Sequence, residues 1–167
     1  MLRNLFLLLV LFSSVVGCSR SPSYKGYVPV TEEEATAFAE QLVERTSQGD
    51  VSWYLEICAD IDSQAAVYAF AGLDVPIDLK DPTEEFEDFL RDTAHEMNKK
   101  IAVCIRELRL LEVKEAGNTY VAFFEFTLEK MNEKTATGDM ITSEEHLTFV
   151  KKRDTGEIFI AAIGMNL

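Results

Sequence analysis

Apolar residues follow a helical spacing in the first half of the chain and a strand-like alternation in the second half. Beyond residue 30, they recur at intervals of three and four residues, which is the spacing of an amphipathic helix. From about Arg106 onward, apolar and polar residues alternate, as in a strand that buries one of its faces. The pattern predicts an α+β fold in which N-terminal helices pack on a curved antiparallel sheet.

The first predicted helix has clear start and stop signals. Thr31 and Glu34 form a capping box, in which each side chain accepts a hydrogen bond from the other residue's backbone N–H. Gly49 stands where a helix commonly ends in a left-handed residue, so we expect the helix to end there. Asp50 is then placed to cap a second, shorter helix.

A third helix is expected to begin at Asp81, with Asp81 as its cap and Pro82 in its first turn. Its apolar stripe, which we expect in the core, consists of Phe86, Phe89, Leu90, Thr93 and Met97. The preceding residues 64–79 fit either a helix or a strand. Within them, Pro76 favours an extended edge segment over residues 75–79.

The alternating half predicts three or four strands that short turns join into an antiparallel meander. The first strand begins near Arg106, and its alternation slips at Leu110 and Leu111, which indicates a β-bulge. Later strands are expected at 120–128, around 147–149 and at 158–163, with turns at 115–118 and 154–156 and a loop at about 131–142.

Residues 1–17 have the three-part layout of a secretory signal, with Arg3, an apolar run and then smaller residues. The run is shorter than the roughly 20 residues that span a bilayer. Val15-Val16-Gly17-Cys18 resembles the bacterial lipobox. The resemblance implies export, cleavage before Cys18, and acyl chains on Cys18 that hold the protein on the cell membrane or the outer membrane. Ser19, in place of Asp, favours the outer membrane. The alternatives are an ordinary signal peptide with an incidental cysteine, or an uncleaved anchor.

The chain therefore divides into a signal peptide at 1–17, a lipidated tether at 18–30 and one domain at 31–167. The tether prediction rests on residues 19–29, which are polar and contain two prolines, as in a spacer. The length beyond the tether is that of a single domain.

The net charge of −13 excludes nucleic acid as a partner, because such partners require a basic surface. It also argues against the domain lying flat on anionic lipid. The acidity is explained by solubility alone, or by a basic partner or cationic ligand. Lys151-Lys152-Arg153 is the basic cluster of the sequence, and we expect either a solvated hairpin tip or a contact with lipid phosphate or an acidic partner.

Two cysteines beyond the lipobox, Cys58 and Cys104, fit a disulfide in an oxidising compartment and fit two separate buried thiols equally well. Their spacing relative to His95 and His146 matches no zinc-binding pattern, so we expect neither a metal nor a cofactor.

Four residues are candidates for acid–base chemistry. Asp60 and Asp62 follow the second helix near Tyr54, and a carboxylate beside a tyrosine suits proton abstraction next to a carbonyl. His95 fits a general base, because an imidazole can accept a proton in such a reaction. The alternative is structural: the acids mark a helix end, and His95 lies at the edge of the apolar stripe. His146 is expected to point into solvent.

The order of elements resembles the nuclear-transport-factor-two-like superfamily, which has a cystatin-like cone fold. The resemblance covers most of residues 31–165 and is carried by residues 35–38 and 49–51 in the first helical pair and by residues 108–113 and 117–122 in the first hairpin. It implies a pocket between the helices and the concave sheet, and a homodimer through the open face of the sheet. No catalytic motif of the superfamily can be placed on this chain.

Two functions fit these observations. The first is a non-catalytic module of the bacterial envelope that binds a protein partner or a small apolar ligand. The second is a small isomerase, dehydratase or hydrolase that uses an acid–base pair in the cone. The second function requires at least two of Tyr54, Asp60, Asp62 and His95 to converge within hydrogen-bond reach in one open cavity.

Overall fold

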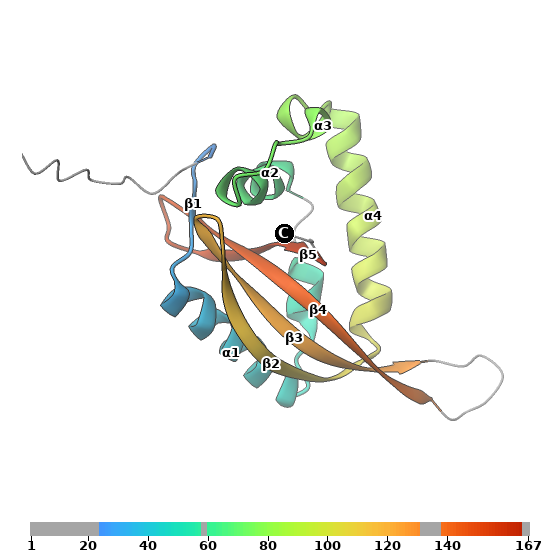
Figure 1. Ribbon diagram of the computed structural model, residues 1–167. Coiled ribbons are helices and arrows are strands. Elements are labelled where there is room, and N and C mark those ends of the chain that lie inside the picture. The colour runs from blue at the N-terminus through green and yellow to red at the C-terminus, as the bar shows by residue number, and fades with distance from the viewer. Residues whose placement is uncertain (1–23, 58–59, 131–137, 165–167) are drawn as a thin grey trace, which may run out of the picture.

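The computed structural model describes residues 24–57, 60–130 and 138–164, and it has helices followed by a curved antiparallel sheet (Figure 1). This confirms the predicted α+β class. The elements are β1 (Tyr27–Pro29), α1 (Glu32–Ser47), the 3-10 helix η1 (Ser52–Glu56), α2 (Ile61–Phe70), α3 (Ile77–Lys80), α4 (Glu84–Ala102), β2 (Ile105–Ala116), β3 (Thr119–Lys130), β4 (Asp139–Lys152) and β5 (Ile158–Ile163). In the described part of the chain, no helix has the length and apolarity needed to cross a membrane.

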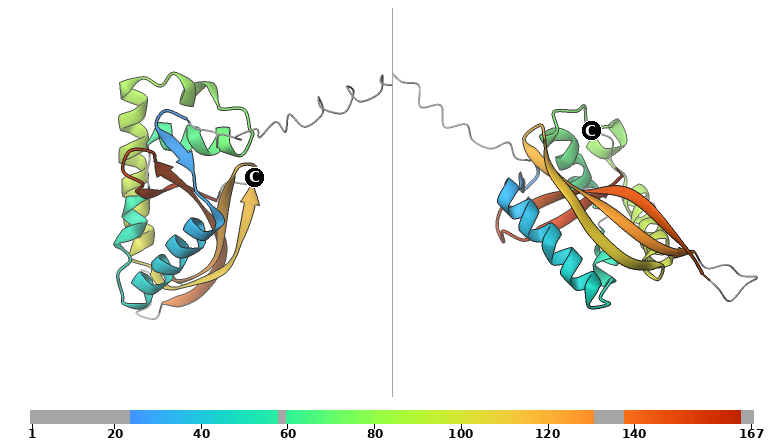
Figure 2. Two further views of the ribbon diagram at one scale, coloured as in Figure 1. Left: turned by 90° about the vertical axis from the view of Figure 1, so that its left-hand side faces the viewer. Right: turned by 60° about the horizontal axis from the view of Figure 1, so that its bottom comes forward.

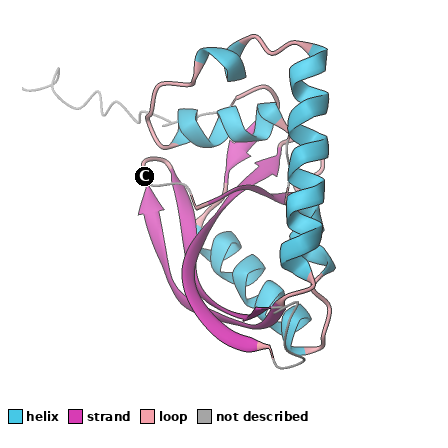
Figure 3. Ribbon diagram, turned by 90° about the vertical axis from the view of Figure 1, so that its right-hand side faces the viewer, coloured by secondary structure: helices cyan, strands magenta, loops and turns pink. Residues whose placement is uncertain are grey.

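The strands β2, β3, β4 and β5 form the predicted meander, and every pairing in the sheet is antiparallel. The order is β1-β4-β3-β2, and β5 pairs with β4 as well. A register shift between Leu110 and Glu112 confirms the predicted bulge. Figure 3 shows the long strands curving around α1.

The concave side of the sheet is filled by large side chains. Trp53, Phe124, Phe126 and Phe149 are each at most 2 % exposed, and they pack with the buried face of α1 in one cluster. Thr46 is buried beside this cluster. Its hydroxyl accepts a hydrogen bond from Trp53 Nε1 at 3.0 Å and donates one to the carbonyl oxygen of Leu42 at 2.8 Å. The cone that the resemblance implies is therefore packed where these aromatic residues meet.

A second cluster lies on the opposite face of the sheet, under α2. Phe70 and Val67 of α2 pack there against Val150 and Ala161. Because successive residues of a strand point to opposite faces, Phe149 contacts the first cluster while Val150 contacts the second. The end of β4 is thus buried on both faces.

The helix starts agree with the sequence in part. The capping box at Thr31 and Glu34 is present, and Gly49 follows α1 with a φ of +81°. Asp50 Oδ1 accepts from Ser52 N at 3.0 Å, but the helix that follows is a 3-10 helix. The cap of α4 is Thr83, whose side chain accepts from Phe86 N, so the prediction of Asp81 was wrong.

Two segments differ from the predicted pattern because tertiary contacts overrule local signals. The extended edge predicted at 75–79 is wrong, since Pro76 caps the short helix α3 and Leu79 is buried. In addition, Asp139 begins β4 inside the predicted loop 131–142. Residues 131–137 of that loop lie outside the described part.

The folded domain begins earlier than the predicted boundary at 31. Tyr27–Pro29 forms β1, which pairs with β4, and both Tyr27 and Val30 are buried. The predicted tether at 18–30 is therefore too long at its C-terminal end. The sequence pattern did not predict this strand, because three residues are too few to show an alternation of apolar and polar residues.

The apolar stripe of α4 is only partly buried, contrary to the prediction. Phe86 and Leu90 pack against the buried cluster at α2 and α3, but Phe89 and Met97 are 63 % and 57 % exposed. The fully buried positions of α4 are Asn98 and Ala102, near its C-terminal end. This helix therefore lies at the edge of the domain.

We predict that Gly117→Ala destabilises the fold more than Gly156→Ala. Both glycines have positive φ, which costs an L-residue about 1 kcal/mol, but only at Gly117 would the new Cβ lie 2.5 Å from the carbonyl oxygen of Phe70. We expect a loss of about 1 kcal/mol for Gly156→Ala and at least about 2 kcal/mol for Gly117→Ala. Urea unfolding followed by the fluorescence of Trp53 measures both, and equal losses would show that α2 does not press on this turn.

Candidate functional site

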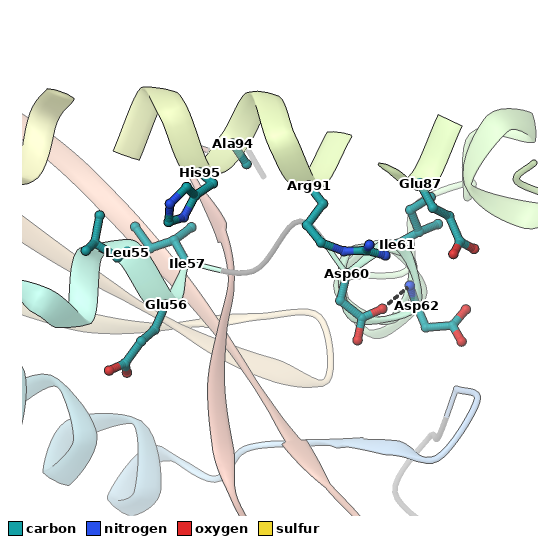
Figure 4. Close-up of a pocket in the computed structure, with 10 residues that line it drawn as sticks. All are labelled: Leu55, Glu56, Ile57, Asp60, Ile61, Asp62, Glu87, Arg91, Ala94 and His95. Atoms are coloured by element: carbon teal, nitrogen blue, oxygen red, sulfur yellow. Dashed lines mark hydrogen bonds between the residues drawn. The ribbon is translucent and has the colours of Figure 1, made fainter. Parts of the chain in front are cut away.

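A cleft of about 370 Å³ lies between α4 and the segment formed by η1 and the start of α2 (Figure 4). Its lining residues are Leu55, Glu56, Ile57, Asp60, Ile61, Asp62, Glu87, Arg91, Ala94 and His95. Three of the predicted candidates, Asp60, Asp62 and His95, are among them. Tyr54 does not line the cleft, although it lies in the 3-10 helix η1 together with Leu55 and Glu56, which do.

Both carboxylate oxygens of Asp60 have structural partners. Oδ1 accepts from the backbone N–H of Asp62 at 2.9 Å and so caps α2, while Oδ2 accepts a hydrogen bond from the hydroxyl of Tyr27. The tyrosine beside Asp60 therefore comes from β1. The predicted pairing with Tyr54 was wrong, because Tyr54 packs in the main core and Tyr27, which no local pattern places beside α2, contacts Asp60 instead.

Tyr54 lies in the main core, where it packs edge-on against Trp53 and Phe126 at centroid distances of 5.4 and 6.2 Å. Burial raises the pKa of its hydroxyl to about 12, and the negative charge of Glu145 adds to this rise. The hydroxyl is therefore protonated at neutral pH, and Tyr54 as a whole is only 4 % exposed. Its geometry is that of a packing residue.

Asp62 and His95 lie apart within the cleft. Asp62 Oδ1 contacts Lys25 Nζ at 2.7 Å. The exposed ring of His95 lies beside Leu55 and Ile57, whereas both aspartates lie on the Arg91 side (Figure 4). Among the described residues, no hydrogen bond joins His95 to either aspartate, so the cleft gathers the three candidates without making an acid–base pair.

The cleft combines an apolar floor with an acidic rim. Leu55, Ile57, Ile61 and Ala94 supply the apolar surface. The acidic side chains are Glu56, Asp60, Asp62 and Glu87, against one guanidinium, Arg91, which also pairs with Asp88 at 2.8 Å. Such a surface accommodates a positively charged group attached to an apolar portion. Glu56, Glu87 and Arg91 carried no signal in the sequence, because the cleft forms only when α4 meets η1.

A second depression of about 530 Å³ shares Asp60 and Asp62 with the cleft and continues toward the start of the domain. Lys25, Lys152 and Arg153 line it together with Asp154. Within the described part of the chain, no group of three or more His, Cys, Asp or Glu side chains is arranged to hold a metal ion.

Cys104 is a half-buried free thiol whose Sγ lies 3.4 Å from the carbonyl oxygen of Lys100. Cys58 lies outside the described residues, so the disulfide between the two stays a prediction. Cys18 and the rest of the lipobox also lie outside the described residues.

His146 does not point into solvent, contrary to the prediction. Its ring packs on Phe123 of the neighbouring strand at 5.3 Å, and its Nε2 atom is buried without a hydrogen-bond partner among the described residues. Burial lowers the pKa of His146 from its ordinary value of 6.5, and the negative charge of Glu145 opposes this shift. The prediction failed because the side chain of Phe123, directly opposite on β3, lies against the ring and leaves His146 half-buried.

The outward face of β2 and β3 carries ion pairs rather than an open apolar surface. Arg109 contacts Glu125 at 2.6 Å, and Lys114 Nζ lies 4.9 Å from the ring centre of Phe123. A homodimer through the sheet face stays a prediction. The contact would have to cover these charged groups as well as the aromatic ring.

We predict that His146 makes the fold less stable in mild acid. The unfolded chain binds a proton near pH 6.5 while the folded chain resists it, so stability is complete above that pH and declines as the pH falls through the lower folded pKa. Replacing His146 with Gln removes the titration and should flatten the decline between pH 7 and pH 5. Urea unfolding at several pH values measures this, and parallel profiles for the two proteins would contradict the prediction.

Comparison with known proteins identifies no relative from which a function could be inferred. No family model, curated protein or solved structure matches this chain. The resemblance to the nuclear-transport-factor-two-like superfamily thus remains a prediction, and the function must be argued from the lipobox and the cleft.

Proposed function

We propose that this chain is a lipoprotein of the bacterial envelope, exported and held on the cell membrane or outer membrane by lipid on Cys18, whose domain binds a ligand or a partner protein without catalysing a reaction. The membrane address rests on the lipobox Val15-Val16-Gly17-Cys18 and the signal-like segment before it. The binding role rests on the cleft beside α4.

The observation that carries the binding role is the contrast between the filled sheet and the open cleft. The aromatic side chains of the concave face occupy the place where an enzyme of the cone fold would hold its substrate. The cleft at α4, in contrast, is open to solvent and lined by apolar and acidic groups. A ligand that fits it is a basic peptide segment or an amine with an apolar portion, since opposite charge favours association.

Acid–base catalysis is the weaker alternative. It requires a base within hydrogen-bond reach of a substrate proton and a second group to complete the proton transfer. Asp60 is already held by Tyr27 and by the start of α2, and Tyr54 lies in the core. His95 remains available in the cleft, but among the described residues no hydrogen bond pairs it with an acidic side chain of the cleft.

The membrane address is tested at Cys18. When the chain is expressed in a bacterium, we expect it in the membrane fraction, with an N-terminal peptide that starts at Cys18 and carries the mass of acyl chains. The Cys18→Ala variant should lose this modification and leave the membrane fraction or keep its signal peptide. If the two proteins have the same mass and fractionation after processing, the lipoprotein proposal is wrong.

The cleft is tested at Glu87, with Glu96 as a matched control on the same helix. Glu87 lines the cleft, whereas Glu96 is exposed outside it, so Glu87→Gln and Glu96→Gln make the same change in net charge. With a short peptide of alternating lysine and leucine as the probe, we expect Glu87→Gln to weaken binding about fivefold to tenfold, the range for one lost charged contact.

Titration calorimetry at low and moderate salt gives both affinities. The Glu96→Gln variant should bind the peptide like the unaltered protein. Equal weakening in the two variants would mean that the peptide responds to the overall charge of the domain, and the cleft would lose its assignment.

A further inference from the structure

The described chain begins at Tyr24, and this residue lies against α2 and α3. Its ring packs beside the buried cluster formed by Ile61, Ala65 and Leu79. The next residue, Lys25, contacts Asp62 through Nζ. The polypeptide therefore joins the domain at the end where α3 lies, next to the N-terminal end of α4 (Figures 1 and 2).

Little chain separates this point from the predicted lipid anchor. Even fully extended, the segment from Cys18 to Tyr24 reaches only about 20 Å. If Cys18 carries lipid, the membrane surface must therefore lie close to α3. The opposite end of the domain, where α4 meets β2, points away from it (Figure 1).

The segment of 71–80 presents apolar side chains at this end. Ile77 is 84 % exposed, the largest value among the exposed large apolar side chains of the described residues, and Leu73 is 42 % exposed. Leu79 is buried, and two residues along a helix correspond to a rotation of about 200°. The burial of Leu79 thus fixes α3 in an orientation that directs Ile77 outward.

Cationic side chains lie close to the point where the described chain joins the domain. The cations Lys25, Lys152 and Arg153 gather in the depression beside Tyr27. Arg153 is held there because its backbone N–H donates to Gly26 O at 2.9 Å.

The acids of the same depression are Asp60, Asp62 and Asp154, so positive and negative groups balance there, while the whole chain carries −13. Asp74 and Asp78 flank Ile77 and limit the depth of insertion to the headgroup region.

We propose that α3 and the loop before it dock on the bilayer surface, with Ile77 and Leu73 inserted among the lipid headgroups. The short tether and this apolar contact together give the domain one orientation on the membrane. The inference rests on the proposed lipidation of Cys18, and it adds a second point of contact that lipidation alone does not require.

The test uses the full lipidated protein in vesicles of phosphatidylcholine and phosphatidylglycerol whose acyl chains are brominated, because bromine quenches tryptophan fluorescence at short range. An Ile77→Trp variant places a probe on α3. Val103→Trp is the matched control, since Val103 is 60 % exposed at the far end of α4. The native Trp53 is buried in every variant and supplies the background signal.

We expect brominated vesicles to quench the added fluorescence of Ile77→Trp by at least half and to leave that of Val103→Trp unchanged. Equal quenching in the two variants would overturn the docking proposal. A measurement without substitutions checks the same contact: vesicles should slow amide hydrogen exchange at 71–80 in the wild-type protein, and unaltered exchange there would also overturn it.

The intact mass of each preparation separates the two proposals. If lipid is present on Cys18 but neither quenching nor protection appears at α3, the docking inference fails and the lipoprotein proposal stands. If the mass shows no lipid, the lipoprotein proposal fails, and the docking inference fails with it.

Discussion

The burial of the C-terminal part of β4 on both of its faces is the constraint on which the other elements depend. Phe149 contacts the cluster formed with α1, and Val150 contacts the cluster under α2, while β1, β3 and β5 all pair with the same strand. Truncating a buried phenylalanine typically costs about 3–5 kcal/mol, so this strand accounts for a large share of the stability of a domain this size.

The position of α2 follows from this strand and determines where the cleft forms. Phe70 packs against Val150, and its carbonyl oxygen accepts from Asn118 N at 2.7 Å, while Asp60 at the other end of α2 meets Tyr27 of β1. The helix is therefore held at both ends. α4 has few buried side chains and contacts the domain mainly through η1, α2 and α3, so a space remains along it. The same arrangement leaves Phe89 and Met97 exposed.

The proposed functions of the two ends of the domain are physically compatible. The end near α3, where the predicted tether would join the domain, exposes Ile77, which suits a lipid surface. The cleft beside it is acidic and suits a cationic partner. Asp60 and Asp62 line both depressions, so the cleft adjoins the point where the described chain joins the domain.

The sequence by itself determined the class of fold, the capping box at Thr31 and the bulge at Leu110, and it predicts the lipid address at Cys18. Each of these depends on a local pattern: a hydrophobic period, a pair of neighbouring side chains or a short motif. Only the tertiary structure decided that Tyr27 meets Asp60, that Tyr54 is a core residue and that Glu87 lines a cleft. Those outcomes depend on which distant segments pack together, and the energy of such contacts is not encoded in the spacing of any single segment.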